Sequence, residues 1–266
     1  MKLAWITDPH LNVAGVQQAM RLMAEVRQMN AGALVVSGDI GEAPDLEGWL
    51  ELMAMQAGCP VYFVLGNHDF YHDSVAEVRA VASVLSQKFP NLCWLGEGDV
   101  IRLTDRTALI GHDGWGDARH GNAMLSRVML ADFHCIEDLM GLSKDVLITK
   151  LQSLGDEAAE VMERALRKAI REGYEEIKVL THVPPFREAC WHEGEQSDDE
   201  WAPYFSCKAV GDMLERVMGE HPECRVHVLC GHTHSGGEAQ VMSNVRVTTG
   251  AAEYRKPVVQ APLWCL

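Results

Sequence analysis

The sequence has no long hydrophobic run, no internal repeat and no low-complexity tract. A membrane-spanning helix needs about 18 or more consecutive apolar residues, and none of the apolar stretches approaches this length. The chain also lacks the long apolar segment and the cleavage site of a signal peptide, because its first apolar run already ends in polar residues at Asp8 and His10. We therefore expect a cytoplasmic protein that has no membrane partner.

Positive charges are scarce. The chain has 23 lysine and arginine residues against 38 aspartate and glutamate residues, which gives a formal net charge of −15. Proteins that follow a nucleic-acid backbone obtain their affinity from lysine and arginine side chains that neutralise phosphates. The charge argues against a nucleic-acid polymer as partner, whereas a small anionic substrate remains compatible if the site holds cations.

The eight cysteines include no C-x-x-C pair. The chain does not have the composition of a small domain that depends on a disulfide framework. We expect these cysteines to be reduced thiols, most of them buried.

The 266 residues, 47% of them hydrophobic, suit one large α/β domain with a sizeable core better than two separate domains. Short aliphatic runs alternate with helical patterns, as in βαβ units around a largely parallel sheet. The predicted strands are Leu3–Thr7, Ala33–Ser37, Val61–Leu65, Ile177–Thr181 and Val226–Cys230. The predicted helices are Val16–Met29, Leu46–Gln56, Val75–Gln87 and a charged helix at Asp156–Gly173.

Two further pairs of short strands favour hairpins, so the architecture should be mixed, with antiparallel strands near the edges. These pairs are Val100–Leu103 with Ala108–Ile110, and Ala239–Met242 with Val245–Thr248. The segments 111–144 and 186–205 are irregular, and the second contains an acidic loop. We interpret them as insertions of the single domain 1–266 that cover its active site.

Polar side chains follow each of the five predicted inner strands. They are Asp8 and His10, then Asp39, then Asn67 and His68, then His182, and finally His232 and His234. One Asp-x-His or Gly-Asp element alone is more often a turn than a site. An open α/β sheet, however, forms its ligand crevice at the carboxyl ends of its strands, so five such ends together predict one functional site.

The order of these motifs resembles that of the calcineurin-like metallophosphoesterases. The family pattern D-x-H, G-D, G-N-H-D, H and G-H-x-H stands here as Asp8-Pro9-His10, Gly38-Asp39, Gly66-Asn67-His68-Asp69, His182 and Gly231-His232-Thr233-His234. The resemblance extends from residue 8 to residue 234. It implies two mixed β-sheets packed as a sandwich and flanked by helices, a four-layer α/β/β/α fold, with a two-metal site at the strand ends.

The resemblance also implies a role for each motif residue. Asp8, His10 and His234 would bind the first metal, Asn67, His182 and His232 would bind the second, and Asp39 would bridge the two. Imidazole nitrogens mixed with carboxylate and amide oxygens suit manganese, iron or zinc, and we favour manganese in vitro. Two such ions would share a water that loses a proton and attacks phosphorus as a metal-bridging hydroxide.

His68 has a different role in the family, in which the corresponding histidine stabilises phosphoryl oxygens or protonates the leaving group. We expect it to be the catalytic residue, with Asp69 bracing the turn. Protein Ser/Thr phosphatases of this superfamily extend the second motif to G-D-x-x-D-R-G, whereas this chain continues with Glu42-Ala43-Pro44. A protein phosphatase is therefore disfavoured, although Glu42 could orient His68.

Substrate contacts are less well defined. His112 also follows a predicted strand, and Arg119 on the same irregular segment could bind a phosphate oxygen. His192 has a weaker signal. Aromatic residues around the acidic loop, including Trp201 and Phe205, could pack against a flat leaving group, although ordinary packing also explains them.

The sequence thus predicts a metallophosphoesterase that hydrolyses a small phosphorylated substrate. The acidic surroundings and the lack of basic clamps favour a phosphodiester over a phosphomonoester such as a nucleotide or sugar phosphate. Nuclease activity and C–N bond hydrolysis are weaker alternatives. A non-catalytic binding scaffold is a different class, but a chain drifting toward it should have lost a ligand or His68, and this sequence retains them all.

Overall fold

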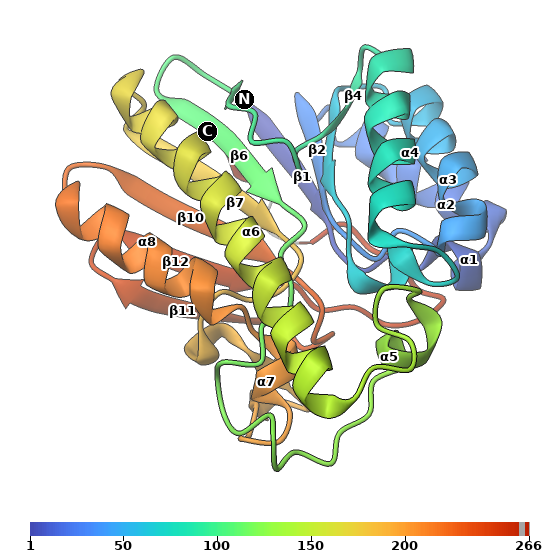
Figure 1. Ribbon diagram of the computed structural model, residues 1–266. Coiled ribbons are helices and arrows are strands. Elements are labelled where there is room, and N and C mark those ends of the chain that lie inside the picture. The colour runs from blue at the N-terminus through green and yellow to red at the C-terminus, as the bar shows by residue number, and fades with distance from the viewer. Residues whose placement is uncertain (261–263, 266) are drawn as a thin grey trace.

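The computed structural model describes residues 1–260 and 264–265. Two large β-sheets pack face to face in the centre of the molecule, and helices cover the outer face of each (Figure 1). The first sheet has the order β13-β1-β2-β3-β4, with the bounds Trp264–Cys265, Lys2–Ile6, Ala33–Ser37, Val61–Val64 and Leu92–Trp94. The second has the order β11-β12-β10-β7-β6-β5, with the bounds Gly237–Met242, Val245–Thr249, Arg225–Cys230, Glu176–Thr181, Thr107–His112 and Ile101–Arg102. A small hairpin, β8 (Trp191–His192) with β9 (Glu195–Gln196), stands apart from both.

The helices form two outer layers (Figure 1). Those beside the first sheet are α1 (Leu11–Ala14), α2 (Val16–Gln28), α3 (Ala43–Gln56) and α4 (Val75–Lys88). Those beside the second sheet are α6 (Lys144–Arg171) and α8 (Lys208–Glu220). The remaining helical turns lie in connecting segments: η1 (Asn67–Phe70), α5 (Asp132–Cys135), η2 (Arg187–Ala189) and α7 (Ala202–Phe205).

The strands separate their side chains between two environments, because successive residues of a strand point to opposite faces. In β1, Leu3 and Trp5 belong to the cluster buried between the sheets, whereas Ala4 and Ile6 pack toward the helices. Leu229 of β10 reaches the same inter-sheet cluster from the second sheet. The inner strands therefore contribute to two cores, and this arrangement produces the four layers.

The predicted fold class is confirmed. All five inner strands and both hairpins form, and the antiparallel pairs β1/β13, β11/β12 and β5/β6 lie at the sheet edges. The helix predicted from residue 156 begins earlier, at Lys144, and continues through Gly155. Glycine weakens an isolated helix, but here it lets α6 approach Asp117, whose Cβ would lie 2.5 Å from a Cβ at this position. The sequence analysis did not predict β4 or α8.

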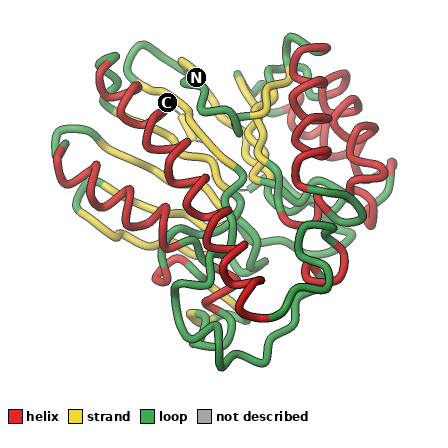
Figure 2. Tube along the Cα trace, in the orientation of Figure 1, coloured by secondary structure: helices red, strands yellow, loops and turns green. Residues whose placement is uncertain are grey.

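Connecting segments gather at one end of the sheets, where α5 and α7 also lie (Figure 2). The parallel strands β1, β2 and β3 end there, and so do β7 and β10 of the second sheet, because each continues into the same cluster of polar residues. Within the described residues, none of the helices combines the length and the apolar character of a membrane span.

Candidate metal centre

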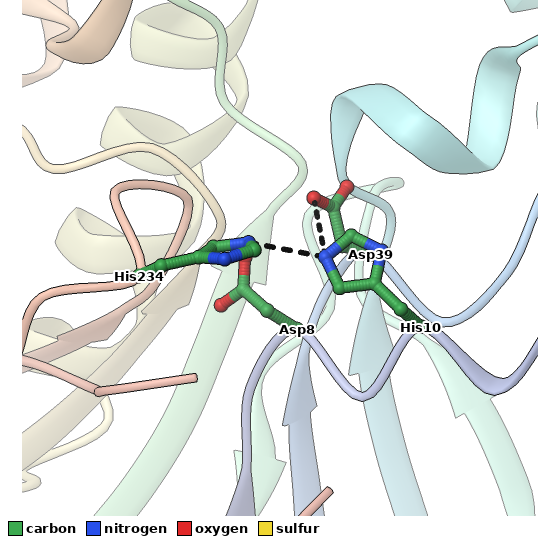
Figure 3. Close-up of side chains that lie close together, drawn as sticks. All are labelled: Asp8, His10, Asp39 and His234. Atoms are coloured by element: carbon green, nitrogen blue, oxygen red, sulfur yellow. Dashed lines mark hydrogen bonds and ion pairs between the residues drawn. The ribbon is translucent and has the colours of Figure 1, made fainter. Parts of the chain in front are cut away.

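Four side chains from three strand ends meet in a first group. Asp8 and His10 follow β1, Asp39 follows β2, and His234 follows β10 (Figure 3). Each offers one ligand atom, and these four atoms lie within 4.8 Å of one another. The Nε2 atoms of His10 and His234 are 3.1 Å apart, and His10 Nε2 lies 3.7 Å from Asp39 Oδ2.

A second group lies on the other side of Asp39. The Oδ1 atom of Asn67 is 3.0 Å from His182 Nε2 and 2.9 Å from His232 Nδ1, and these two ring nitrogens are 3.1 Å apart. Asp39 Oδ1 lies 3.4 Å from His182 Nε2. The two oxygens of Asp39 thus face different groups, which is the arrangement that a bridging carboxylate needs.

The backbone at these residues is unusual. Only a few per cent of non-glycine residues adopt positive φ, yet five of the proposed ligands do so: Asp8 (46°), His10 (40°), Asp39 (52°), His232 (72°) and His234 (59°). Such conformations cost about 1–3 kcal/mol each and persist only where the surrounding structure imposes them. The tight turns at the strand ends therefore hold the ligands in place at a cost to local stability.

Glycines allow the ligand loops to approach one another closely. A Cβ atom on Gly66 would collide with the side chain of Asp39, and one on Gly231 would collide with Asp8. Gly38 has a φ of +87°, and a Cβ there would lie 2.6 Å from His182 Nδ1. The glycines in the motifs are thus required by packing against the ligands.

Two histidines have their ring orientation fixed by backbone carbonyls. His182 Nδ1 donates to the carbonyl oxygen of Ser37 (2.8 Å), and His232 Nε2 donates to that of Tyr204 (3.1 Å). Because a carbonyl oxygen can only accept, the proton of each neutral ring lies on these nitrogens. The opposite nitrogens, His182 Nε2 and His232 Nδ1, then present lone pairs to Asn67 Oδ1.

Burial shifts the pKa values of the histidines and of the carboxyl groups at the centre in opposite directions, and in both cases it favours the uncharged form. Burial, reinforced by neighbouring histidines, lowers the pKa of His10 to about 2 and that of His234 to about 4, so both rings are neutral at pH 7. Burial raises the pKa of Asp8 to about 7 against the hydrogen bonds it accepts. It also raises the pKa of Asp39, and nearby carboxylates add to this shift.

The donor atoms fit divalent cations. In the second group, three lone pairs converge within about 3 Å of one another with no proton between them, on Asn67, His182 and His232. Electron pairs that converge in this way repel one another unless a cation lies between them. A mixed set of imidazole nitrogens and carboxylate or amide oxygens suits borderline metals such as manganese, iron and zinc.

His68 lies beside the centre and lines the cleft above it. Its ring stacks on Tyr71, with centroids 4.3 Å apart, and meets the His10 ring edge-on at 4.7 Å. Asp69 stabilises the turn as expected, because its side chain accepts hydrogen bonds from the backbone N–H groups of Gly41 and Gly66, each at 2.8 Å. The idea that Glu42 orients His68 is wrong.

Glu42 is instead engaged at the start of α3. Its backbone N–H donates to Asp45 Oδ1 at 3.0 Å, and its Oε2 lies 3.5 Å from His72 Nε2. The ring that packs against His68 is that of Tyr71, one residue before His72. The carboxylate of Glu42 is therefore placed beside His72.

A cleft of about 350 Å³ opens above the metal ligands. Leu130 and Ala131, from the segment 111–144, line it together with His192 and Phe205 from the segment 186–205. The exposed ring of Tyr254 also borders it, 4.6 Å from the His10 ring and 5.0 Å from the His234 ring. The walls are therefore largely apolar and aromatic.

The structure places His112 and Arg119 away from this cleft. His112 is buried at the end of β6, where its Nδ1 accepts the backbone N–H of Gly114 at 3.2 Å. Arg119 forms ion pairs with Asp117 (3.0 Å) and Asp156 (2.8 Å). These pairs direct the guanidinium toward α6, and neither residue is among those that line the cleft.

Three residues at the centre were missed or undervalued by the sequence analysis: Asp132, Tyr254 and His192. A signal for Tyr254 existed, because it follows β12, which runs parallel to β10 and ends at the same edge. The sequence pattern indicated only the hairpin of β11 with β12, so the parallel pairing of β12 with β10 was not predicted. Asp132 had no comparable signal, since it lies in an irregular segment.

The family model described as calcineurin-like phosphoesterase matches residues 1–236. Among curated proteins, none matches the sequence. The match covers every motif residue of the centre and ends before Tyr254.

Several solved structures share the fold. A phosphopantetheinyl hydrolase from Mycobacterium tuberculosis is 14% identical, with a TM-score of 0.63 over 98% of this chain and 96% of its own. A dimetal phosphatase from Danio rerio is 13% identical, with a TM-score of 0.57 over 94% of this chain and 87% of its own. The protein TT1561 of Thermus thermophilus is 12% identical, with a TM-score of 0.54 over 94% and 89%. At these identities the likeness establishes the fold alone.

Proposed function

The chain belongs to the calcineurin-like phosphoesterase family and is a phosphoric ester hydrolase; from this premise we propose that it hydrolyses a small phosphodiester at a centre of two divalent cations. Asp8, His10 and His234 would hold the first cation, Asn67, His182 and His232 would hold the second, and Asp39 lies between the two groups, where it would serve both. Manganese, iron or zinc suits these donors, and manganese is our choice for reconstitution in vitro. When bound, the cations supply Lewis acidity and an activated water.

The observation that supports a diester most is the composition of the cleft. None of the described residues that line it is a lysine or an arginine. A terminal phosphate monoester carries up to two negative charges, which enzymes usually meet with cationic side chains. A diester carries one negative charge and has a second organic group, for which the apolar walls provide a surface.

The aromatic wall suggests where that organic group lies. His192 and Phe205 line the cleft, with ring centroids 5.1 Å apart, and Trp201 packs against both at 4.9 and 5.0 Å. Phe205 in turn meets the ring of His232 edge-on at 5.2 Å. A flat or apolar substituent on a phosphate at the centre would lie against Phe205 and His192. The segments 111–144 and 186–205 then form the two walls of the substrate site.

His68 is the residue proposed to act on the substrate. Burial, reinforced by neighbouring histidines, lowers its pKa to about 3, so the ring is neutral at pH 7. A neutral imidazole donates one N–H hydrogen bond. From its place above Asp39, His68 donates this bond to a phosphoryl oxygen or to the oxygen of the departing group.

A substrate panel tests the proposal. The Mn²⁺-reconstituted protein is assayed against bis(4-nitrophenyl) phosphate and 4-nitrophenyl phosphate, with Asp39→Ala as the control for contaminating activity. We expect kcat/KM for the diester to exceed that for the monoester by about tenfold or more. Preference for the monoester would show that the protein is a monoesterase and not a diesterase. Hydrolysis of neither, with two cations bound, would support a binding scaffold.

A further inference from the structure

A buried carboxylate from the segment 111–144 contacts two residues of the centre. Asp132, the first residue of α5, is 4% exposed. Its Oδ1 accepts hydrogen bonds from Asn67 Nδ2 (2.8 Å) and from the hydroxyl of Tyr71 (2.7 Å). One oxygen atom thus holds both a proposed metal ligand and the tyrosine that stacks on His68.

The bond to Asn67 determines which end of the amide faces the second metal position. An ionised carboxylate only accepts hydrogen bonds, so the amide nitrogen has to face Asp132. The amide oxygen is then turned toward His182 Nε2 (3.0 Å) and His232 Nδ1 (2.9 Å). A flipped amide would place its oxygen against the carboxylate and would present N–H groups, which cannot bind a cation, to the metal position.

The bond to Tyr71 acts on the side of the centre where the substrate binds. The Tyr71 ring stacks on His68 at an interplanar angle of 30°. Because the Tyr71 hydroxyl donates a hydrogen bond to Asp132, the Tyr71 ring has a fixed position against His68. Both Tyr71 and Asp132 also line the cleft.

Asp132 is itself held in place by neighbouring hydrogen bonds. The backbone N–H of His72 donates to the carbonyl oxygen of Cys135 at 2.6 Å, and the backbone N–H of Val75 donates to Asp138 Oδ2 at 2.8 Å. These bonds connect the residues that follow Asp132 to the segment 72–75, which leads into α4. The segment 72–75 comes shortly after η1, the turn that contains Asn67.

We propose that Asp132 is a positioning residue, which orients the amide of Asn67 for the second cation and steadies His68 through Tyr71. Carboxylates that hydrogen-bond to metal-binding imidazoles have the corresponding effect in other sites, because they fix the ligand and increase its basicity. The inference rests on the metal ligation by Asn67 given under the proposed function. It does not depend on which phosphoester is the substrate.

Calorimetric titration of Mn²⁺ into the metal-free, full-length protein tests the inference, because it reports the number of sites and the affinity of each. We expect Asp132→Ala to weaken one of two sites by about 10- to 100-fold and to leave the other nearly unchanged. Asp132→Asn keeps a carbonyl oxygen that can accept both hydrogen bonds, so it should restore most of the lost affinity.

Asp117→Ala is the matched control. Asp117 is a fully buried carboxylate of the same segment, but its oxygens accept hydrogen bonds from Arg119 and from the backbone of Ala209. This variant should lose stability without a change in either Mn²⁺ affinity. If Asp132→Ala does not fold, Asp132→Leu replaces it, since its apolar side chain fills the space but accepts no hydrogen bond, and the same weakening is expected.

Three results would overturn the inference: equal affinities in the wild type and the Asp132 variant, an equal loss in Asp117→Ala, or no recovery in Asp132→Asn. A wild-type protein that binds fewer than two cations would overturn the proposed metal centre and the inference with it. Two-site binding without hydrolysis of any phosphoester would overturn the function alone, because the difference in affinity between the variants would remain.

Discussion

Among single residues, His68 differs from the other histidines of the centre in its surroundings. His182 and His232 each donate a hydrogen bond to a backbone carbonyl and turn the opposite nitrogen inward. His68 instead packs its ring against Tyr71 and His10. Like His232, it borders the open cleft. This difference agrees with the proposed roles, in which His68 meets the substrate and the other two histidines hold a cation.

Replacing His68 by asparagine should therefore reduce turnover more than metal content. We expect His68→Asn to lower kcat by about 10²- to 10⁴-fold, the usual contribution of a positioned proton donor. Metal analysis of the purified variant should still find two cations per chain. A folded His68→Asn protein without metal would show that the division of roles is wrong.

The buried carboxyl groups predict that cation binding releases protons. Burial raises the pKa of Asp8 from its ordinary value of 3.8 to about 7, so this group keeps its proton at pH 6 in the folded, metal-free protein and loses it as the pH rises through about 7. A cation has to displace that proton. Binding at pH 6 should release about one proton or more, and the contribution of Asp8 should disappear above about pH 8.

Calorimetry in buffers of different ionisation enthalpy measures this release. The observed binding heat at pH 6 should change with the buffer, in proportion to the number of protons released. Identical heats in all buffers at pH 6 would show that Asp8 and Asp39 are already ionised before the cation binds.

At the scale of elements, an ion-pair cluster joins the two helices that cover the second sheet. Glu163 of α6 accepts hydrogen bonds from Arg167 of the same helix and from both terminal nitrogens of Arg216 on α8, each at 2.8 Å. The spacing of Glu163 and Arg167 was visible in the sequence. The contact with Arg216 arises only because α6 and α8 pack side by side (Figure 1).

Glu163→Gln should lower the free energy of unfolding by about 1 kcal/mol at pH 7, a value that allows for solvent screening of a surface cluster. The hydrogen bonds from Arg216 and Arg167 lower the pKa of Glu163 from 4.5 to about 2. This stabilisation is therefore complete above about pH 5 and is lost as the pH falls toward 2. Urea unfolding of the wild type and of Glu163→Gln should show a difference in the free energy of unfolding that becomes smaller between pH 5 and about pH 3. A constant difference would exclude the ionised carboxylate as its cause.

At the scale of the whole molecule, each proposed metal position takes its residues from both sheets. The first combines Asp8, which follows β1, with His234, which follows β10. The second combines Asn67, which follows β3, with His182, which follows β7. The inter-sheet core already holds these sheets together. A bound cation would add a second connection at the end where the ligands carry strained backbone.

Removal of metal should therefore destabilise the entire fold. A ligand at 100 times its Kd stabilises the native state by about 2.7 kcal/mol per site, so we expect saturating Mn²⁺ to raise Tm by roughly 10 °C over the EDTA-treated protein. Thermal unfolding followed by circular dichroism measures the shift. Asp39→Ala, which removes the bridging carboxylate, should show a much smaller one. An equal shift in that variant would indicate metal binding elsewhere.

The sequence by itself determined which residues at the strand ends approach the centre. Short aliphatic runs predicted the inner strands, and the polar residues after them predicted a common edge, because parallel strands place their carboxyl ends together. Asp8, Asp39 and His182 could be recognised in this way from local pattern alone. These features depend on neighbours in the chain, which a sequence displays directly.

Tertiary structure alone decided what surrounds those residues. Asp132 meets Asn67 across 65 positions of sequence, and Tyr254 meets His10 across a still longer separation. Arg119 had the right chemistry for a phosphate, but α6 supplies Asp156 to pair with it. The partners of irregular segments are set by packing between distant elements, and local periodicity carries no information about such contacts.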